Sequence, residues 1–272
     1  MSRNVLSSAK RKKRKRLFLR AFLLWLFVVL FLFGVIFFLF FLDNFKIKEV
    51  VFTGASSFWE KELGEIINKT LSAKTFFVIP NNRIFSFPAN KTQTALLDKY
   101  SQLKSLRISR KFFSGLDVVV EERVPVAIIC TELNEDKECS FLDRTGYIFE
   151  ESPLFSPGVF VRFVDFRPIQ PQIGENLLEE NDFRDILNFK DKLADVFRVS
   201  EIYLKPEKVF ELYPEKEGDQ FEGWYLIFDS RDNLELLYDN LEVFLKEDVS
   251  RSLAEIEYVD LRFGNKIFFK NK

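Results

Sequence analysis

The sequence predicts an α+β protein that is held to a membrane by one N-terminal helix. Two observations lead to this prediction. Segment 21–42 contains no charged residue. The roughly 230 residues behind it carry both the alternating apolar patterns of strands and apolar residues at helical spacing. That length is enough for two modest domains or one large one, with a core that does not depend on disulfides.

The uncharged segment 21–42 is predicted to be a transmembrane helix. A helix of 22 residues is about 33 Å long, slightly more than the roughly 30 Å hydrocarbon core of a bilayer. A cleaved secretory signal is the alternative. Its apolar core is normally shorter, and no small-residue cleavage pattern follows here, since the chain continues with Asp43 and Asn44. We therefore expect a retained, single-pass anchor.

Positive charge is concentrated before this anchor. Residues 1–20 contain nine basic side chains, most of them in the run 10–16, and no acidic one. The positive-inside rule therefore predicts a cytoplasmic tail and an external remainder. That remainder holds 31 of the 40 basic residues and all 41 acidic ones, a net charge of −10. A nucleic-acid patch is the alternative for the basic run, but its place beside a membrane span favours membrane topology and attraction to anionic lipids.

The composition excludes several classes of enzyme. The chain has no histidine, and its one methionine is the first residue, which removes Ser-His-Asp and Cys-His systems and most zinc sites. We expect no catalytic residue, no metal site and no cofactor. The two cysteines, Cys130 and Cys139, lie in the predicted external part, where a disulfide can form. Two independent thiols are the alternative, and the sequence leaves both open.

Residues 43–124 are expected to form a first domain in the order strand, helix, helix, strand, strand. The first strand stops at Gly54, and Ser57 and Glu60 have the spacing of a capping box at the start of a helix. Apolar residues at helical spacing continue this helix: Trp59, Leu63, Ile66, Ile67 and Leu71. A second helix is indicated by four further residues: Leu96, Leu97, Tyr100 and Leu103.

Residues 125–272 are expected to form a larger mixed α/β domain with a mainly antiparallel sheet. Short apolar strands alternate with turns, and Gly146 supplies the positive φ that one of these turns needs. The domain is predicted to end in a hairpin over 256–270 with a Gly-Asn turn. A last helix is indicated by apolar residues over 234–245. An earlier helix is indicated by five residues: Phe183, Ile186, Leu187, Ala194 and Phe197.

Two motifs connect this order of elements to a known family. The run 122–127, Glu-Arg-Val-Pro-Val-Ala, closes the first domain, and the run 258–262, Tyr-Val-Asp-Leu-Arg, lies in the terminal hairpin. Together with the anchor, they resemble the FtsQ/DivIB family of bacterial cell-division proteins. The resemblance implies a POTRA domain over 43–124 and an FtsQ/DivIB-type β domain over 125–272. From the residues alone, the charged pair that includes Arg123 is expected in solvent at a strand end.

The terminal hairpin is the predicted functional region. Because side chains alternate along a strand, Val259, Leu261 and Phe263 should share one face. Asp260 and Arg262 could be a reactive acid and its clamp, but no histidine or cysteine lies nearby to complete a mechanism. A terminal strand instead leaves backbone groups free, and a partner chain can add a strand there.

In the FtsQ/DivIB family, this region receives a strand and a helix from a small single-pass partner, FtsB or DivIC. The resemblance therefore implies a partner-binding site made of Arg262, Phe263, Lys266, Ile267, Phe268, Phe269 and Lys270. It also implies a non-enzymatic divisome scaffold at the septum, which joins FtsL and FtsB/DivIC coiled-coil proteins and helps regulate septal peptidoglycan synthases.

Two other functions stay open at this stage. POTRA domains also hold client chains in protein-translocation machines, so an anchored one could be an accessory of protein translocation or secretion. Such proteins usually repeat the domain, and no repeat is visible in this sequence. A wall hydrolase would need acids and nucleophiles gathered in a cleft, for which the sequence offers no constellation.

Overall fold

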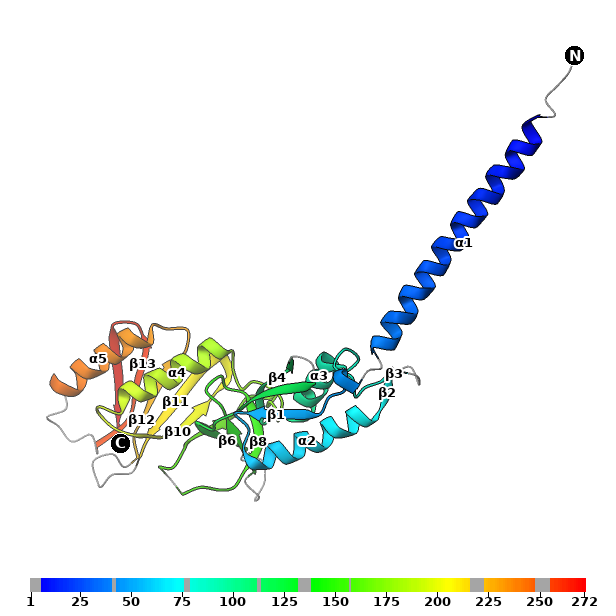
Figure 1. Ribbon diagram of the computed structural model, residues 1–272. Helices are drawn as coiled ribbons and strands as arrows, with labels where there is room; N and C mark the ends of the chain where they lie inside the picture. Colours follow the sequence, from blue (N-terminus) through cyan, green and yellow to red (C-terminus); the bar gives the residue numbers. More distant parts are fainter. Residues whose placement is uncertain are drawn as a thin grey trace, which may run out of the picture. The chain divides into compact units, whose positions relative to one another are not determined.

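The computed structural model describes residues 6–40, 43–75, 79–111, 114–131, 138–156, 158–215, 223–247 and 255–272. Helix α1 (Leu6–Phe40) begins inside the basic tail and continues through the predicted anchor (Figure 1). Its segment Leu17–Val35 has a mean hydropathy of 2.5, and none of it is buried. At 19 residues this segment is about 28 Å long, close to the thickness of a hydrocarbon core. The last two residues of the predicted span, 41–42, lie outside the described residues.

The chain forms two compact units that both contain helices and strands, which confirms the α+β class. The first unit consists of Met1–Leu96 and Leu106–Val120, and the second of Leu97–Ser105 and Glu121–Lys272. The elements that follow α1, up to residue 122, are η1 (Asp43–Phe45), β1 (Glu49–Thr53), α2 (Ser57–Ser72), β2 (Lys74–Thr75), β3 (Ile79–Pro80), α3 (Ala89–Lys99), β4 (Leu103–Lys111) and β5 (Gly115–Glu122). Three of these strands form a sheet in the order β1-β5-β4, in which β1 is parallel to β5.

Two local features shape the first unit: a glycine turn after β1 and the buried apolar face of α2. Gly54 has a φ of 81°, and a Cβ atom at this position would lie 2.4 Å from the carbonyl oxygen of Val120. Only glycine therefore fits where the chain leaves β1. Helix α2 buries Trp59, Leu63 and Ile67, which repeat every four residues on one face.

Two local predictions for this part are wrong. The cap residue of α2 is Ser56, which makes no side-chain capping bond, and Ser57 is already helical. With this cap, the third helical position is Trp59, so the reciprocal glutamate bond of a capping box cannot form. The second helix, α3, ends at Lys99, so Tyr100 and Leu103, which were predicted to belong to it, lie beyond its end. Leu103 instead begins β4 and is buried there, because an apolar residue at helical spacing also fits a buried strand position.

The second unit is built on one mixed sheet. Its strands are β6 (Ala127–Thr131), β7 (Glu138–Leu142), β8 (Ile148–Ser152), β9 (Val161–Asp165), β10 (Val199–Leu204), β11 (Val209–Pro214), β12 (Tyr225–Asp229), β13 (Ile256–Phe263) and β14 (Lys266–Asn271). Their order in the sheet is β14-β13-β12-β11-β10-β9-β6-β7-β8. Neighbours are parallel at β12–β13, β9–β10 and β6–β9, and antiparallel elsewhere. The remaining elements are α4 (Glu180–Leu193), η2 (Pro206–Lys208) and α5 (Leu234–Glu247).

Helices α4 and α5 cover one face of this sheet (Figure 1). Their apolar stripes and alternate strand residues form one core, in which Phe163, Phe183 and Phe228 are completely buried. We call the opposite side of the sheet the open face. Two residues of the predicted α4 stripe lie beyond the helix: Ala194 caps it and is exposed, and Phe197 follows it but is buried in the core. The helical spacing ends at Leu193, so Ala194 no longer follows it.

A buried ion pair fixes the start of the second unit, contrary to the prediction that Arg123 lies in solvent. Its side chain is 14% exposed and pairs with the carboxylate of Asp143. Its Nε donates to the carbonyl oxygen of Ser101 at 3.0 Å, and its guanidinium carbon lies 3.8 Å from the centre of the Tyr147 ring. The prediction failed because the partner carboxylate lies 20 residues further along the chain.

Asp143 organises the turn that leads into β8. Its Oδ1 accepts hydrogen bonds from the backbone N–H and the hydroxyl of Thr145 at 2.8 and 2.6 Å, and from the N–H of Tyr147 at 3.2 Å. Burial disfavours ionisation of this carboxyl group, but the hydrogen bonds from Thr145 and Arg123 outweigh burial and lower the pKa of Asp143. Gly146 has the predicted positive φ, 79°.

Candidate partner-binding edge

The last two strands carry all seven residues of the predicted partner-binding site. β13 and β14 pair in antiparallel orientation on either side of Gly264, whose φ is 67°. The side-chain amide of Asn240, on α5, donates to the carbonyl oxygen of Gly264 at 3.2 Å. Among the described strands, β14 has β13 as its single neighbour in the sheet. The outer backbone edge of β14 can therefore pair with an added strand.

Three phenylalanines on this hairpin are half exposed. The exposed fractions are 52% for Phe263, 51% for Phe268 and 50% for Phe269. Phe268 is paired with Asp260 and its ring lies 4.7 Å from that of Phe263. Phe269 faces the other way and lies 5.5 Å from Phe244 of α5. The hairpin thus offers apolar area on both faces beside an unpaired edge, a combination that a partner strand or helix can cover.

The predicted alternation along β13 holds only in part. Val259 and Leu261 are buried, but Phe263 is exposed instead of sharing their face. The pairing with β14 shifts register between Asp260 and Phe263. Such a bulge inserts one unpaired residue and turns the following side chains away from the strict period of two.

Asp260 and Arg262 form a local clamp. Asp260 is buried, and its carboxylate accepts from the backbone N–H of Arg262 at 3.1 Å, from Nε at 2.8 Å and from Nη2 at 2.6 Å. The hydrogen bond to Asp260 raises the pKa of Arg262. The guanidinium group is therefore held in one orientation by its own strand, and 37% of the Arg262 side chain stays exposed.

The remaining site residues lie on β14. Lys266 and Lys270 are exposed, and Ile267 is partly buried against the main core. Lys270 Nζ lies 2.5 Å from a carboxylate oxygen of Glu257, and this hydrogen bond raises the pKa of Lys270. Charged residues along the edge limit unspecific pairing between strands.

Among the described residues, an Asp-x-Arg clamp occurs three times, which was not predicted. In each case, the backbone N–H and Nε of the arginine donate to Oδ1 of the aspartate two residues earlier, and Nη2 donates to Oδ2. The spacing in the sequence was only a partial signal, since Asp182 and Arg184 on α4 have the same spacing but pair with Lys208 and Asn181. The three pairs are Asp165–Arg167, Asp229–Arg231 and Asp260–Arg262.

A row of tyrosines on the open face was also missed. Ring centres are 4.5 Å apart for Tyr203 and Tyr213, 5.0 Å for Tyr213 and Tyr225, and 5.8 Å for Tyr225 and Tyr258. Burial, followed by the charge of Glu211, raises the pKa of Tyr213. The four rings come from four different strands, so only the sheet order brings them together. They pack on one another and stabilise the open face.

Cys130 and Cys139 are joined by a disulfide in the structure. They occupy directly paired positions on β6 and β7, and both are buried. The disulfide links β6 to β7 and lies next to a small apolar cluster that contains Ile128, Phe141 and Phe160.

A separate groove of about 460 Å³ lies in the first unit. One side is formed by residues in and before β1, and the other by α2. β1 is an end strand of its sheet, so the groove runs beside a backbone edge. Its lining residues are Ile47, Lys48, Val50, Phe52, Glu60, Lys61, Gly64, Glu65, Asn68 and Leu71.

No protein-family model matches the chain. The cell division protein DivIB of Clostridium tetani (strain Massachusetts / E88) is 22% identical to it over 182 residues. The matched region covers 67% of this chain and 60% of DivIB, so the chain spans less than two thirds of that protein's length. The similarity supports a distant relationship to the FtsQ/DivIB family and suggests a role in cell division.

Proposed function

We propose that this protein is a non-enzymatic, membrane-anchored scaffold of the bacterial divisome. The observation that carries this proposal is the similarity to DivIB over 182 residues. The apolar segment Leu17–Val35 supports it, because it can anchor the protein in the cell membrane. The basic residues before this segment support an orientation with the N-terminus in the cytoplasm and residues 43–272 outside.

In this proposal, residues 43–124 are a POTRA domain and residues 125–272 are an FtsQ/DivIB-type β domain. The order β1, α2, α3, β4, β5 and the parallel pairing of β1 with β5 support the first assignment. The nine-stranded sheet that ends at β14, together with the motif around Asp260 and Arg262, supports the second.

The proposed mechanism is strand addition at β14, with no cofactor. A partner strand would satisfy the outer backbone groups of β14, while apolar partner residues cover Phe268 and Phe269. The partners would be FtsL and FtsB/DivIC coiled-coil proteins, which would bring the scaffold together with septal peptidoglycan synthases. Since both proteins are confined to one membrane, even a modest strand-pairing affinity would hold them together.

Depletion of the protein in its own host tests this function. We expect filaments or chains of undivided cells, and we expect a fluorescent fusion to gather at midcell before constriction. Uniform membrane fluorescence together with normal division after depletion would overturn the proposal.

The groove between β1 and α2 favours one alternative, an accessory of protein translocation or secretion. An extended client segment could lie beside the β1 edge there. In this case, depletion would leave division intact and would instead lead to accumulation of unexported proteins in the cytoplasm. A proteomic comparison of the two cell fractions would detect this.

A further inference from the structure

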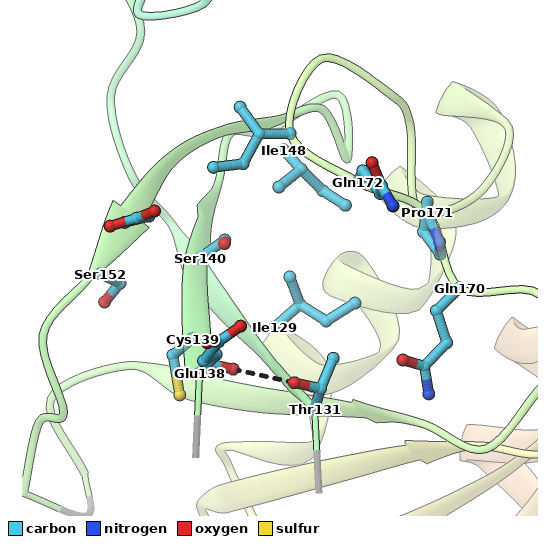
Figure 2. Close-up of a pocket in the computed structure, with 12 residues that line it drawn as sticks. Ile129, Thr131, Glu138, Cys139, Ser140, Ile148, Ser152, Gln170, Pro171 and Gln172 are labelled. Carbon is cyan, nitrogen blue, oxygen red and sulfur yellow. Dashed lines mark hydrogen bonds between the residues drawn. The ribbon is translucent and has the colours of Figure 1, made fainter. Parts of the chain in front are cut away.

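A cavity of about 710 Å³ lies in the second unit, at the ends of β6, β7 and β8 (Figure 2). One wall is the face of these three strands, since Ile129 is paired with Ser140, and Ser140 with Glu151. The next pair along the same face is Thr131 with Glu138. Figure 2 shows the segment from Gln170 to Gln172 on the opposite side of the opening. This cavity is far along the sheet from β14, because β8 and β14 are its two end strands.

The lining combines an apolar surface with negative charge. Ile129 and Ile148 line the cavity but are buried, so the exposed apolar surface comes mainly from Ile173 of the loop, which is 42% exposed. Glu138 and Glu151 are exposed carboxylates of the lining. None of the described lining residues is basic. The cavity therefore disfavours anions and suits a ligand that joins an aliphatic stem to a positive charge.

Several donors of this lining are already used within the protein. Gln170 Nε2 donates to the carbonyl oxygen of Asp165 at 2.7 Å, which leaves its amide oxygen as an acceptor. The N–H of Gln172 donates to the carboxylate of Glu175 at 3.0 Å, and the Ser152 hydroxyl donates to the carbonyl oxygen of Pro153 at 2.9 Å. The carboxylates and the Gln170 oxygen thus offer acceptors, so the complementary ligand is a hydrogen-bond donor.

We propose that this cavity binds a short peptide segment through a lysine side chain. The four-carbon stem lies on Ile173, and the ammonium group donates to the carboxylates of Glu138 and Glu151. The volume falls within the usual range of about 300–1,000 Å³ for ligand sites and exceeds the needs of one side chain. The remaining space, next to Ser140 and Gln170, accommodates peptide backbone groups. This proposal does not rest on the role in division.

Fluorescence anisotropy with the full chain in nanodiscs of neutral lipid tests the proposal. The probe is a fluorescein-labelled tetrapeptide amide, Ala-Lys-Ala-Ala, and its matched analogue has norleucine in place of lysine. We expect the lysine peptide to bind at least tenfold more tightly than the norleucine peptide, and to weaken as salt is raised. Equal binding of the two peptides would overturn the proposal. Free 1,5-diaminopentane that competes as strongly as the unlabelled peptide would also overturn it, because the site would then select an amine and not a peptide.

Variants connect the binding to this cavity. The double variant E138Q/E151Q should weaken binding of the lysine peptide about tenfold, because two exposed charge pairs are lost. Glu150→Gln is the matched control, since Glu150 is exposed on β8 but is paired with Phe141 on the open face. It should leave binding unchanged. Unchanged binding by the double variant, with an unfolding curve like that of the wild type, would place the peptide elsewhere and contradict the proposal.

Discussion

Arg123 holds three segments of the second unit together. Its guanidinium group pairs with Asp143, stacks on Tyr147 and donates to the carbonyl oxygen of Ser101. Only 14% of its side chain and 5% of that of Asp143 are exposed. Breaking a buried ion pair at one partner is costly, because the other charge loses its compensation while it stays away from water.

Arg123→Leu should therefore lower the free energy of unfolding by about 3 kcal/mol. Arg144→Leu is the matched control, since Arg144 is exposed in the same turn, and it should change this free energy by no more than about 0.5 kcal/mol. Urea denaturation of the full chain in detergent, followed by circular dichroism, measures both. A similar loss of unfolding free energy in the two variants would show that the buried pair contributes no more to stability than the exposed Arg144 does.

The lowered pKa of Asp143 predicts a pH dependence of stability. A carboxyl group whose pKa is lower in the folded state stabilises the protein above its unfolded pKa of about 3.9, and this contribution disappears as the pH falls through the folded pKa. Asp143→Asn should cost about 2–3 kcal/mol at pH 7, because it removes the charged partner of Arg123. The difference from the wild type should shrink steadily below about pH 4.

Urea denaturation at pH 7, 5 and 3 provides the measurement. Asp195→Asn is the control, since Asp195 is exposed after α4, and its curve should follow the wild type throughout. If the difference in unfolding free energy between Asp143→Asn and the wild type stayed constant with pH, the predicted titration of Asp143 would be contradicted.

At the residue scale, sequence patterns predicted the local backbone conformation better than they predicted which side chains contact each other. The positive φ of Gly146 follows from the turn itself. The pairing of Arg123 with Asp143, and the alignment of Tyr203 with Tyr213, depend on which segments the fold brings together. Side-chain spacing in the sequence does not contain that information.

Among the elements, β14 is the one whose exposed groups bear most directly on the proposed function. Its outer edge is open among the described strands, and it presents Phe268 on the open face and Phe269 toward α5. A charge at either ring would meet an apolar partner surface without compensation. Phe268 is the better position for a test, because its ring contact is with Phe263 on the same hairpin and not with the core.

Phe268→Glu should reduce capture of the proposed FtsB/DivIC-type partner at least tenfold in a pull-down from co-expressing membranes. The thermal transition should move by only a few degrees, since the side chain is half exposed. Ile169→Glu is the matched control, because Ile169 is 87% exposed in a loop of the same unit, and it should not reduce capture. Undiminished capture by Phe268→Glu would move the interface away from β14.

The existence of most helices and strands was predictable, but their ends were not. The stripe Trp59, Leu63 and Ile67 follows directly from helical spacing. The start of α2 depends on which serine caps it, and the exposure of Phe263 depends on a bulge that forms only when β13 meets β14. Both are consequences of pairing and packing, which local patterns describe incompletely.

For the whole molecule, the uncharged segment predicted the anchor, and the spacing of apolar residues predicted the α+β class, because both signals extend over many residues. The order of the nine-stranded sheet was not predictable. β6 lies beside β9, and β12 lies parallel to β13, although each pair is separated by other elements in the sequence. Such pairings bring together residues that are far apart in the sequence, and no local pattern specifies them.

Charge at the two ends of the anchor predicts its orientation. The run 10–16 contains only lysine and arginine, whereas Lys46 and Lys48 are the first basic residues after the span. Retention of the more basic end predicts an N-terminus in the cytoplasm. In protoplasts treated with protease, a C-terminal epitope should be lost and an N-terminal epitope protected.

Replacing the seven residues 10–16 with glutamine should make a substantial fraction of the chains invert, because the charge difference across the span then falls to nearly nothing. K46Q/K48Q should have no such effect, since it increases the excess of positive charge on the N-terminal side. Protection of the C-terminal epitope in the unaltered protein would contradict this orientation, and β14 would then face the cytoplasm, out of reach of an external partner.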